Sequence, residues 1–105
     1  MTKEIVVLIT APSSGEARAI GRCLVEEKLA ACANIVPRVG SIFFWQGKVR
    51  QERESLMILK TRASCFRRLE KRVKSLHSYS VPEIIALPIL RGSKDYLSWI
   101  RKTTR

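Results

Sequence analysis

Apolar residues form short blocks along the chain, and the spacing within each block predicts a strand or a helix. The run from Glu4 to Thr10 holds five consecutive branched apolar residues, which is typical of a strand covered on both faces. Ser13 followed by Glu16 fits a capping box at the start of a helix over about residues 15–28. The core-facing stripe of that helix is Ala17, Ile20, Gly21 and Leu24.

A long hairpin is predicted in the middle of the chain. An extended segment over 30–45 bends near Pro37, and Gln46-Gly47 is a sequence typical of a two-residue hairpin turn. The returning strand is polar from Lys48 to about Glu54 and apolar from Leu56 to Leu59. One end of the hairpin is therefore expected to be solvated and the other buried.

The last third of the chain predicts a second helix over about residues 64–76, a strand over Pro82 to Leu90 and a short final helix capped by Ser93. The second helix carries one apolar stripe at a 3-4-3 spacing, which consists of Phe66, Leu69, Val73 and Leu76. The final helix carries Tyr96, Leu97, Trp99 and Ile100.

This order of elements predicts an α+β fold, a ferredoxin-like β-α-β-β-α-β plait plus a short C-terminal helix, in one domain over 1–105. Both main helices then lie on the same face of the sheet. The strands are nevertheless apolar on both faces, and an open apolar face of that size is not stable in water. We therefore expect the chain to form a homo-oligomer that buries this face between copies.

Composition adds charge and location to this prediction. Lys and Arg number 20 against 9 Asp and Glu, which gives a net charge of +11 and raises the question of an anionic partner. The apolar run near the start is too short for a signal peptide or a membrane span. Cys23, Cys32 and Cys65 form no Cys-x-x-Cys pair. The sequence thus predicts reduced thiols, a cytoplasmic location and no membrane partner.

Five stretches carry a resemblance to a known family. They are Leu29-Ala30-Ala31-Cys32, Ser41-Ile42-Phe43-Phe44-Trp45-Gln46-Gly47-Lys48, Ile58-Leu59-Lys60-Thr61, His77-Ser78-Tyr79-Ser80-Val81-Pro82-Glu83 and Tyr96-Leu97-Ser98-Trp99-Ile100. In this order and spacing they resemble the CutA, or divalent-cation tolerance, family. The resemblance implies a ferredoxin-like homotrimer, similar in architecture to the PII signalling proteins, that is associated with tolerance of copper and other divalent cations and has no established enzymatic reaction.

His77 and Cys32 are the candidate metal ligands. Imidazole suits Cu(II), zinc and nickel, whereas a thiolate suits Cu(I) or zinc, so Cu(II) or another divalent cation is the expected ligand. Some bacterial members of the family linked to copper carry a cysteine at the position of Ile9 and a second histidine at the position of Leu76. This chain has neither of these two ligands. The alternative for Cys32 is a small core residue, and for His77 a helix cap or a structural hydrogen bond.

A second set of candidates combines aromatic, cationic and acidic side chains near strand ends. We expect these residues to line a cleft between subunits that holds a small anion or a hydrated cation. The alternative is packing and salt bridging at the interface. The set is Trp45, Glu52, Glu54, Lys60, Tyr79 and Glu83. It supports a second functional hypothesis, a PII-like signalling or assembly module that binds a small anionic ligand at subunit clefts.

Two further functions are less favoured by the residues. The basic second helix would support nonspecific nucleic-acid contact, but no segment matches an RNA-recognition motif, and a solvated face is the simpler interpretation. The loop Ala11 to Gly15 has one glycine and no phosphate-binding motif, and the single histidine has no Ser-His-Asp order around it. The sequence therefore predicts a protein that is not an enzyme.

Overall fold

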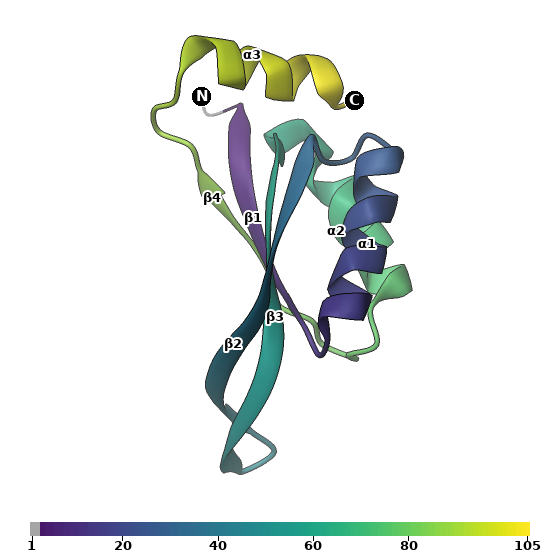
Figure 1. Cartoon of the computed structure of the whole chain (residues 1–105), viewed down its shortest axis with the longest axis vertical. Helices are drawn as coiled ribbons and strands as arrows, with labels where there is room; N and C mark the ends of the chain where they lie inside the picture. Colours follow the sequence, from purple (N-terminus) through teal and green to yellow (C-terminus); the bar gives the residue numbers. More distant parts are fainter. Residues whose placement is uncertain (1–2) are drawn as a thin grey trace.

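The computed structural model describes residues 3–105 and contains four strands and three α-helices (Figure 1). The strands form one antiparallel sheet in the order β2-β3-β1-β4. This confirms the predicted ferredoxin-like plait with an added C-terminal helix. In chain order the elements are β1 (Glu4–Ala11), α1 (Ser14–Glu26), β2 (Cys32–Trp45), β3 (Lys48–Arg62), a 3-10 turn (Ala63–Cys65), α2 (Phe66–Leu76), β4 (Ile84–Pro88) and α3 (Lys94–Thr103).

Helices α1 and α2 cover one face of the sheet, and α3 lies across the end at which β1 begins (Figure 1). The core between helices and sheet combines alternate residues of β1 and β3 with both predicted helical stripes. Its fully buried members include Val7, Ile9, Ala17, Ile20, Leu24, Met57, Leu59, Leu69 and Val73. The end under α3 is closed by an ion pair of 3.0 Å between Arg101 and Glu4.

Beyond the sheet, β2 and β3 continue as a two-stranded arm over residues 39–54 (Figure 1). The arm ends in the predicted turn, where Gln46 and Gly47 have φ of 50° and 81°, as a type I′ turn requires. The pairing of β2 with β3 is irregular between Val36 and Val39. Strand β4 is shorter than the predicted 82–90, because Pro82 and Pro88 lack the amide hydrogen of a continuous ladder.

The face of the sheet opposite α1 and α2 is apolar and open. Val36, Ile85 and Leu87 are 37%, 50% and 47% exposed, and the residues between them on this face are half-buried. Those residues are Val6, Leu8, Leu56 and Ile58. Neither α1 nor α2 covers this face (Figure 1), and in the described part of the chain α3 reaches only the Cys32 end of it, through Tyr96. The physical basis for the predicted oligomer is therefore present in the fold.

Candidate functional site

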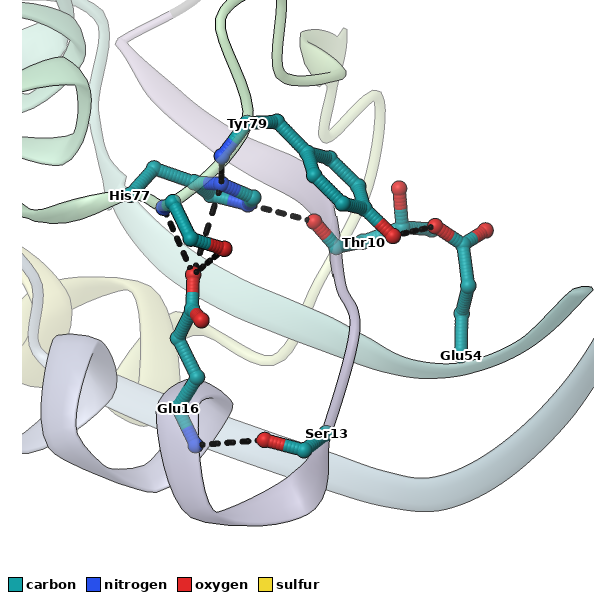
Figure 2. A network of polar contacts seen from close by, with 7 residues as sticks. Thr10, Ser13, Glu16, Glu54, His77 and Tyr79 are labelled. Carbon is teal, nitrogen blue, oxygen red and sulfur yellow. Dashed lines mark hydrogen bonds and ion pairs between the residues drawn. The ribbon is translucent and has the colours of Figure 1, made fainter.

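Polar residues from four parts of the chain meet where β1 ends (Figure 2). Thr10 lies near the end of β1, and Ser13 and Glu16 lie at the start of α1. His77 to Tyr79 belong to the loop between α2 and β4, and Glu54 lies at the base of the arm. We call these residues, together with Ser78, the His77 network.

His77 occupies the centre of this network and caps α2. Its backbone N–H donates to Val73 O at 2.8 Å, and its side chain is 0% exposed. The ring Nδ1 accepts a hydrogen bond from the Tyr79 backbone N–H at 3.0 Å. Nε2 lies 2.7 Å from Thr10 O, and since a carbonyl only accepts, Nε2 carries the hydrogen. Both ring nitrogens are therefore engaged within the subunit.

Glu16 connects the start of α1 to the same loop. Its backbone N–H donates to Ser13 Oγ at 3.2 Å, as the predicted cap requires. The carboxylate, however, accepts from Ser78 N–H and Ser78 Oγ at 2.8 and 2.9 Å, and lies 3.5 Å from His77 Nδ1. Only half of the predicted capping box forms, because two donors of the distant loop take up the carboxylate.

Tyr79 connects the loop to the base of the arm. Its hydroxyl donates to Glu54 Oε2 at 2.7 Å, and Glu54 is only 7% exposed. Burial, followed by the hydrogen bond to Glu54, raises the pKa of Tyr79 above its ordinary value. The hydroxyl thus stays neutral and supplies the buried carboxylate with a donor.

A second polar cluster lies on the open face of the sheet. Lys60 Nζ donates to Asn34 Oδ1, and Cys32 Sγ lies 3.9 Å from the same oxygen and 3.6 Å from the hydroxyl of Tyr96 in α3. The hydrogen bond with Cys32 and partial burial raise the pKa of Tyr96. We call Cys32, Asn34, Lys60 and Tyr96 the Cys32 cluster.

The structure separates most of the residues proposed from the sequence. Tyr79 and Glu54 meet, but Lys60 joins the Cys32 cluster instead of these two. Trp45 pairs with Lys48 at the tip of the arm, Glu52 pairs with Ser41 along the arm, and Glu83 precedes β4.

The two candidate metal ligands are also apart. Cys32 pairs with Lys60 of β3, which pairs with Val6 of β1, so Cys32 is level with Val6. His77 contacts Thr10, which is four residues further along β1. Four residues of a strand span roughly 13 Å. Within residues 3–105 no three or more His, Cys, Asp or Glu side chains lie close enough together to hold a metal ion. The described residues therefore do not show a cluster of three such side chains for a divalent cation.

Comparison with known proteins places this arrangement in a family. The family model described as CutA1 divalent ion tolerance protein matches residues 5–103. The chain belongs to the CutA1 family. The divalent-cation tolerance protein CutA of Thermus thermophilus is 54% identical over 96% of this chain and 98% of its own. Its solved structure superposes with a TM-score of 0.95 over 97% of this chain and 99% of its own.

Other solved CutA1 structures agree with the fold. CutA1 from Oryza sativa is 44% identical, with a TM-score of 0.96 over 99% of this chain and 95% of its own. A CutA from Archaeoglobus fulgidus, described as a periplasmic divalent cation tolerance protein, is 45% identical, with a TM-score of 0.94 over 97% and 99% of the two chains. These matches confirm the family indicated by the five sequence stretches and the ferredoxin-like fold predicted from the order of the elements. In this chain's own described residues, no helix is long and apolar enough to cross a membrane.

Sequence reasoning did not name six members of the two clusters as site residues. Two of them, Ser13 and Ser78, appeared only in the predicted cap of a helix and in a family stretch. Thr10 contributes only its backbone carbonyl. Since every residue type has a backbone carbonyl, the sequence gives no signal for this contact. Asn34 and Tyr96 required the strand register and the position of α3. Glu16 was read as a local cap, although the pair Ser13 and Glu16 was the one signal for a polar site at this end of β1.

Proposed function

We propose that this protein contributes to the tolerance of divalent metal ions, copper among them, as a non-enzymatic homotrimer in the cytoplasm. Family membership supports the role in tolerance. The observation that carries the proposed assembly is the open apolar sheet face, on which Ile85 and Leu87 of the edge strand β4 are half exposed. Copies that cover this face bury apolar area at about 25 cal/mol per Å², which favours assembly. Three free cysteines without a disulfide fit a reducing compartment.

Metal contact in this proposal belongs to the assembly, since residues 3–105 of one subunit hold no cluster of three His, Cys, Asp or Glu side chains. Cys32 lies on the open face, where another copy brings further donors within reach. His77 is the less accessible candidate, because a metal ion at either ring nitrogen replaces a hydrogen bond of the fold.

Light scattering and calorimetry test this function together. We expect a particle of three times the chain mass, and we expect metal-free protein to take up Cu(II) or Zn(II) with heat that Cys32→Ser reduces. His77→Ala serves as the comparison at the other candidate ligand. A monomer at micromolar concentration would refute the assembly, and the absence of metal heat in all three proteins would refute direct binding.

The PII-like alternative is favoured by one observation, the ammonium of Lys60 on the face that assembly would cover. In this hypothesis Lys60 binds a small phosphorylated ligand at the boundary between subunits. Titration with inorganic phosphate and with a nucleoside triphosphate, repeated on Lys60→Ala, tests it. Saturable heat that Lys60→Ala abolishes would favour this alternative over metal tolerance, and no heat would reject it.

A further inference from the structure

The cations of α2 are concentrated on the outer side of the helix layer, away from both polar clusters. Arg67 and Arg68 each lie one turn from Lys71, and all three side chains are exposed. Residues at this spacing are neighbours on a helix surface, so their like charges repel. In residues 3–105 no carboxylate forms an ion pair with any of the three.

The acidic residues near α2 are already engaged. Glu27 forms a two-pronged contact with Arg72, with distances of 2.9 to 3.1 Å, and raises the pKa of that guanidinium through hydrogen bonding and charge. Glu70 pairs with Lys74 at 3.3 Å. The charge of the remaining three cations is therefore left for a partner outside the subunit.

A groove of about 360 Å³ runs between the end of α1 and α2 beside these cations. Its lining is Glu27, Leu29, Arg68, Lys71, Arg72 and Ser75, and we call it the basic groove. The backbone of Lys28 lies close to the Arg68 end of the groove. Its carbonyl accepts a hydrogen bond from the Arg105 N–H at 3.0 Å. Arg105 in turn lies near Arg68, because Arg105 O and the Arg68 guanidinium both contact Cys65 Sγ at 3.6 Å. Arg68 and Lys71 line the groove, Arg67 lies one turn from Lys71 on the same helix, and Lys28 stands between two lining residues in the sequence. Four exposed cations thus lie in the groove or next to it.

We propose that the basic groove binds the phosphate backbone of a nucleic-acid duplex without reading its sequence. Guanidinium and ammonium groups are the side chains that bind phosphate, and guanidinium does so bidentately. The exposed large apolar residues all lie on the open sheet face, the arm, α3 or the loops around β4, and none lies on α1 or α2. Leu29 is the apolar residue of the lining, and it is only 7% exposed. The groove therefore presents no exposed apolar side chain that could insert into a membrane surface and no aromatic side chain that could stack on single-stranded bases.

The groove does not depend on the proposed metal role or on trimer formation. Its lining residues belong to α2 and to the segment that follows α1. Helices α1 and α2 lie on one face of the sheet (Figure 1), whereas assembly is expected to cover the opposite face. Assembly would repeat the groove on the outside of the particle and raise its avidity for a long polyanion. A failed duplex test would leave the metal and assembly tests unaffected, and the reverse also holds.

Fluorescence anisotropy with a labelled mixed-sequence DNA duplex of about 30 base pairs tests the proposal across about 50 to 200 mM salt. Four phosphate contacts give a slope of log K against log salt of about −3.6, so the affinity falls roughly 150-fold over this range. Arg68→Ala/Lys71→Ala removes two contacts and should halve the slope, which leaves a fall of roughly 12-fold. Arg91→Ala/Lys94→Ala removes the same charge at the far end of α3 and should keep the full slope.

These duplex measurements, with two further ligands as comparisons, provide the outcomes that overturn the proposal. The two ligands are the labelled single strand and phosphatidylserine vesicles. No binding of wild type at low salt, or equal loss in both double variants, would show that the groove has no special part. Tighter binding to the single strand would reject the duplex as the ligand. Binding to phosphatidylserine vesicles that is lost in Arg68→Ala/Lys71→Ala, without duplex binding, would assign the groove to a membrane surface instead. Circular dichroism confirms that both variants are folded.

Discussion

The hydrogen bond from Tyr79 to Glu54 joins the loop after α2 to the base of the arm, and its contribution to the free energy of unfolding can be measured. The two oxygens lie 2.7 Å apart, and Glu54 is 7% exposed, so little water can replace the hydroxyl. A hydrogen bond to a charged group contributes about 1.5 to 3 kcal/mol, and an unsatisfied buried carboxylate has a penalty of similar size. Tyr79→Phe should therefore lower the free energy of unfolding by about 2 kcal/mol.

A double-mutant cycle isolates this contact from general packing. Glu54→Gln keeps an acceptor oxygen but removes the charge, so it should weaken the bond and lower the stability by about 1 kcal/mol. In the double variant the loss should be smaller than the sum of the two single losses by about 1 kcal/mol. Tyr96→Phe is the matched control, because its hydroxyl makes only a long contact of 3.6 Å with the sulfur of Cys32, and it should lose less than about 1 kcal/mol.

The pH dependence has a defined sign. Burial and Glu54 raise the pKa of Tyr79 in the folded protein, so the folded state holds this proton more tightly than the unfolded state. The resulting stability is complete below the unfolded pKa of about 10 and is lost as the pH rises through the folded pKa. Above about pH 10 the advantage of wild type over Tyr79→Phe should shrink by at most about 1.4 kcal/mol per pH unit.

Urea denaturation followed by circular dichroism measures both effects, at one fixed protein concentration because the proposed assembly would contribute to stability. Two results would refute the reasoning. One is a loss below about 0.5 kcal/mol in Tyr79→Phe, which is too small for a buried charged hydrogen bond. The other is a wild type and a Phe variant whose stabilities run parallel above pH 10.

Three further predictions concern α1 and the open face. Gly15→Ala, whose new Cβ meets only Ser13 Oγ at 3.9 Å, should raise stability by about 0.5 kcal/mol. Gly21→Ala should give no gain, because its Cβ would lie 3.1 Å from Ala33 Cβ, and equal gains in thermal melts would contradict this. Ser13→Ala should lower stability by about 1 kcal/mol through loss of the α1 cap, and an unchanged melting temperature would argue against it. Ile85→Lys, at a position 50% exposed, should reduce the particle mass seen by light scattering, and an unchanged mass would remove this face from the interface.

The elements that the sequence predicts well are those set by local periodicity. The stripe Ala17, Ile20, Gly21 and Leu24 is the buried side of α1, and the Gln46-Gly47 turn lies where it was expected. The partner of Glu16 could not be predicted, since Ser78 is 62 positions away and reaches it only after α2 packs on the sheet. Long-range contacts of this kind depend on tertiary packing rather than on a local pattern.

Strand register explains why the candidate site divided into two clusters. If β2 and β3 kept the register that they have next to the Gln46-Gly47 turn, Cys32 would lie opposite Thr61. Thr61 is a buried core position. The irregularity between Val36 and Val39 shifts the pairing by one residue and places Cys32 opposite Lys60 on the open face. A bend near Pro37 was predicted from the sequence. Its effect on the register depends on how many residues each of the two strands contributes at the irregularity, and composition does not give this number.

This register shift also ranks the two candidate metal ligands. At His77 an incoming ion must displace the Tyr79 N–H or the bond to Thr10 O, and each such bond is worth about 0.5 to 1.5 kcal/mol. Since about 1.4 kcal/mol corresponds to a tenfold change in affinity, the fold itself weakens metal binding at this ring by up to roughly tenfold. Cys32 makes only long contacts through its sulfur and lies on the face that a second copy would cover. Metal chemistry in this protein is therefore expected at Cys32 between subunits before it is expected at His77 within one.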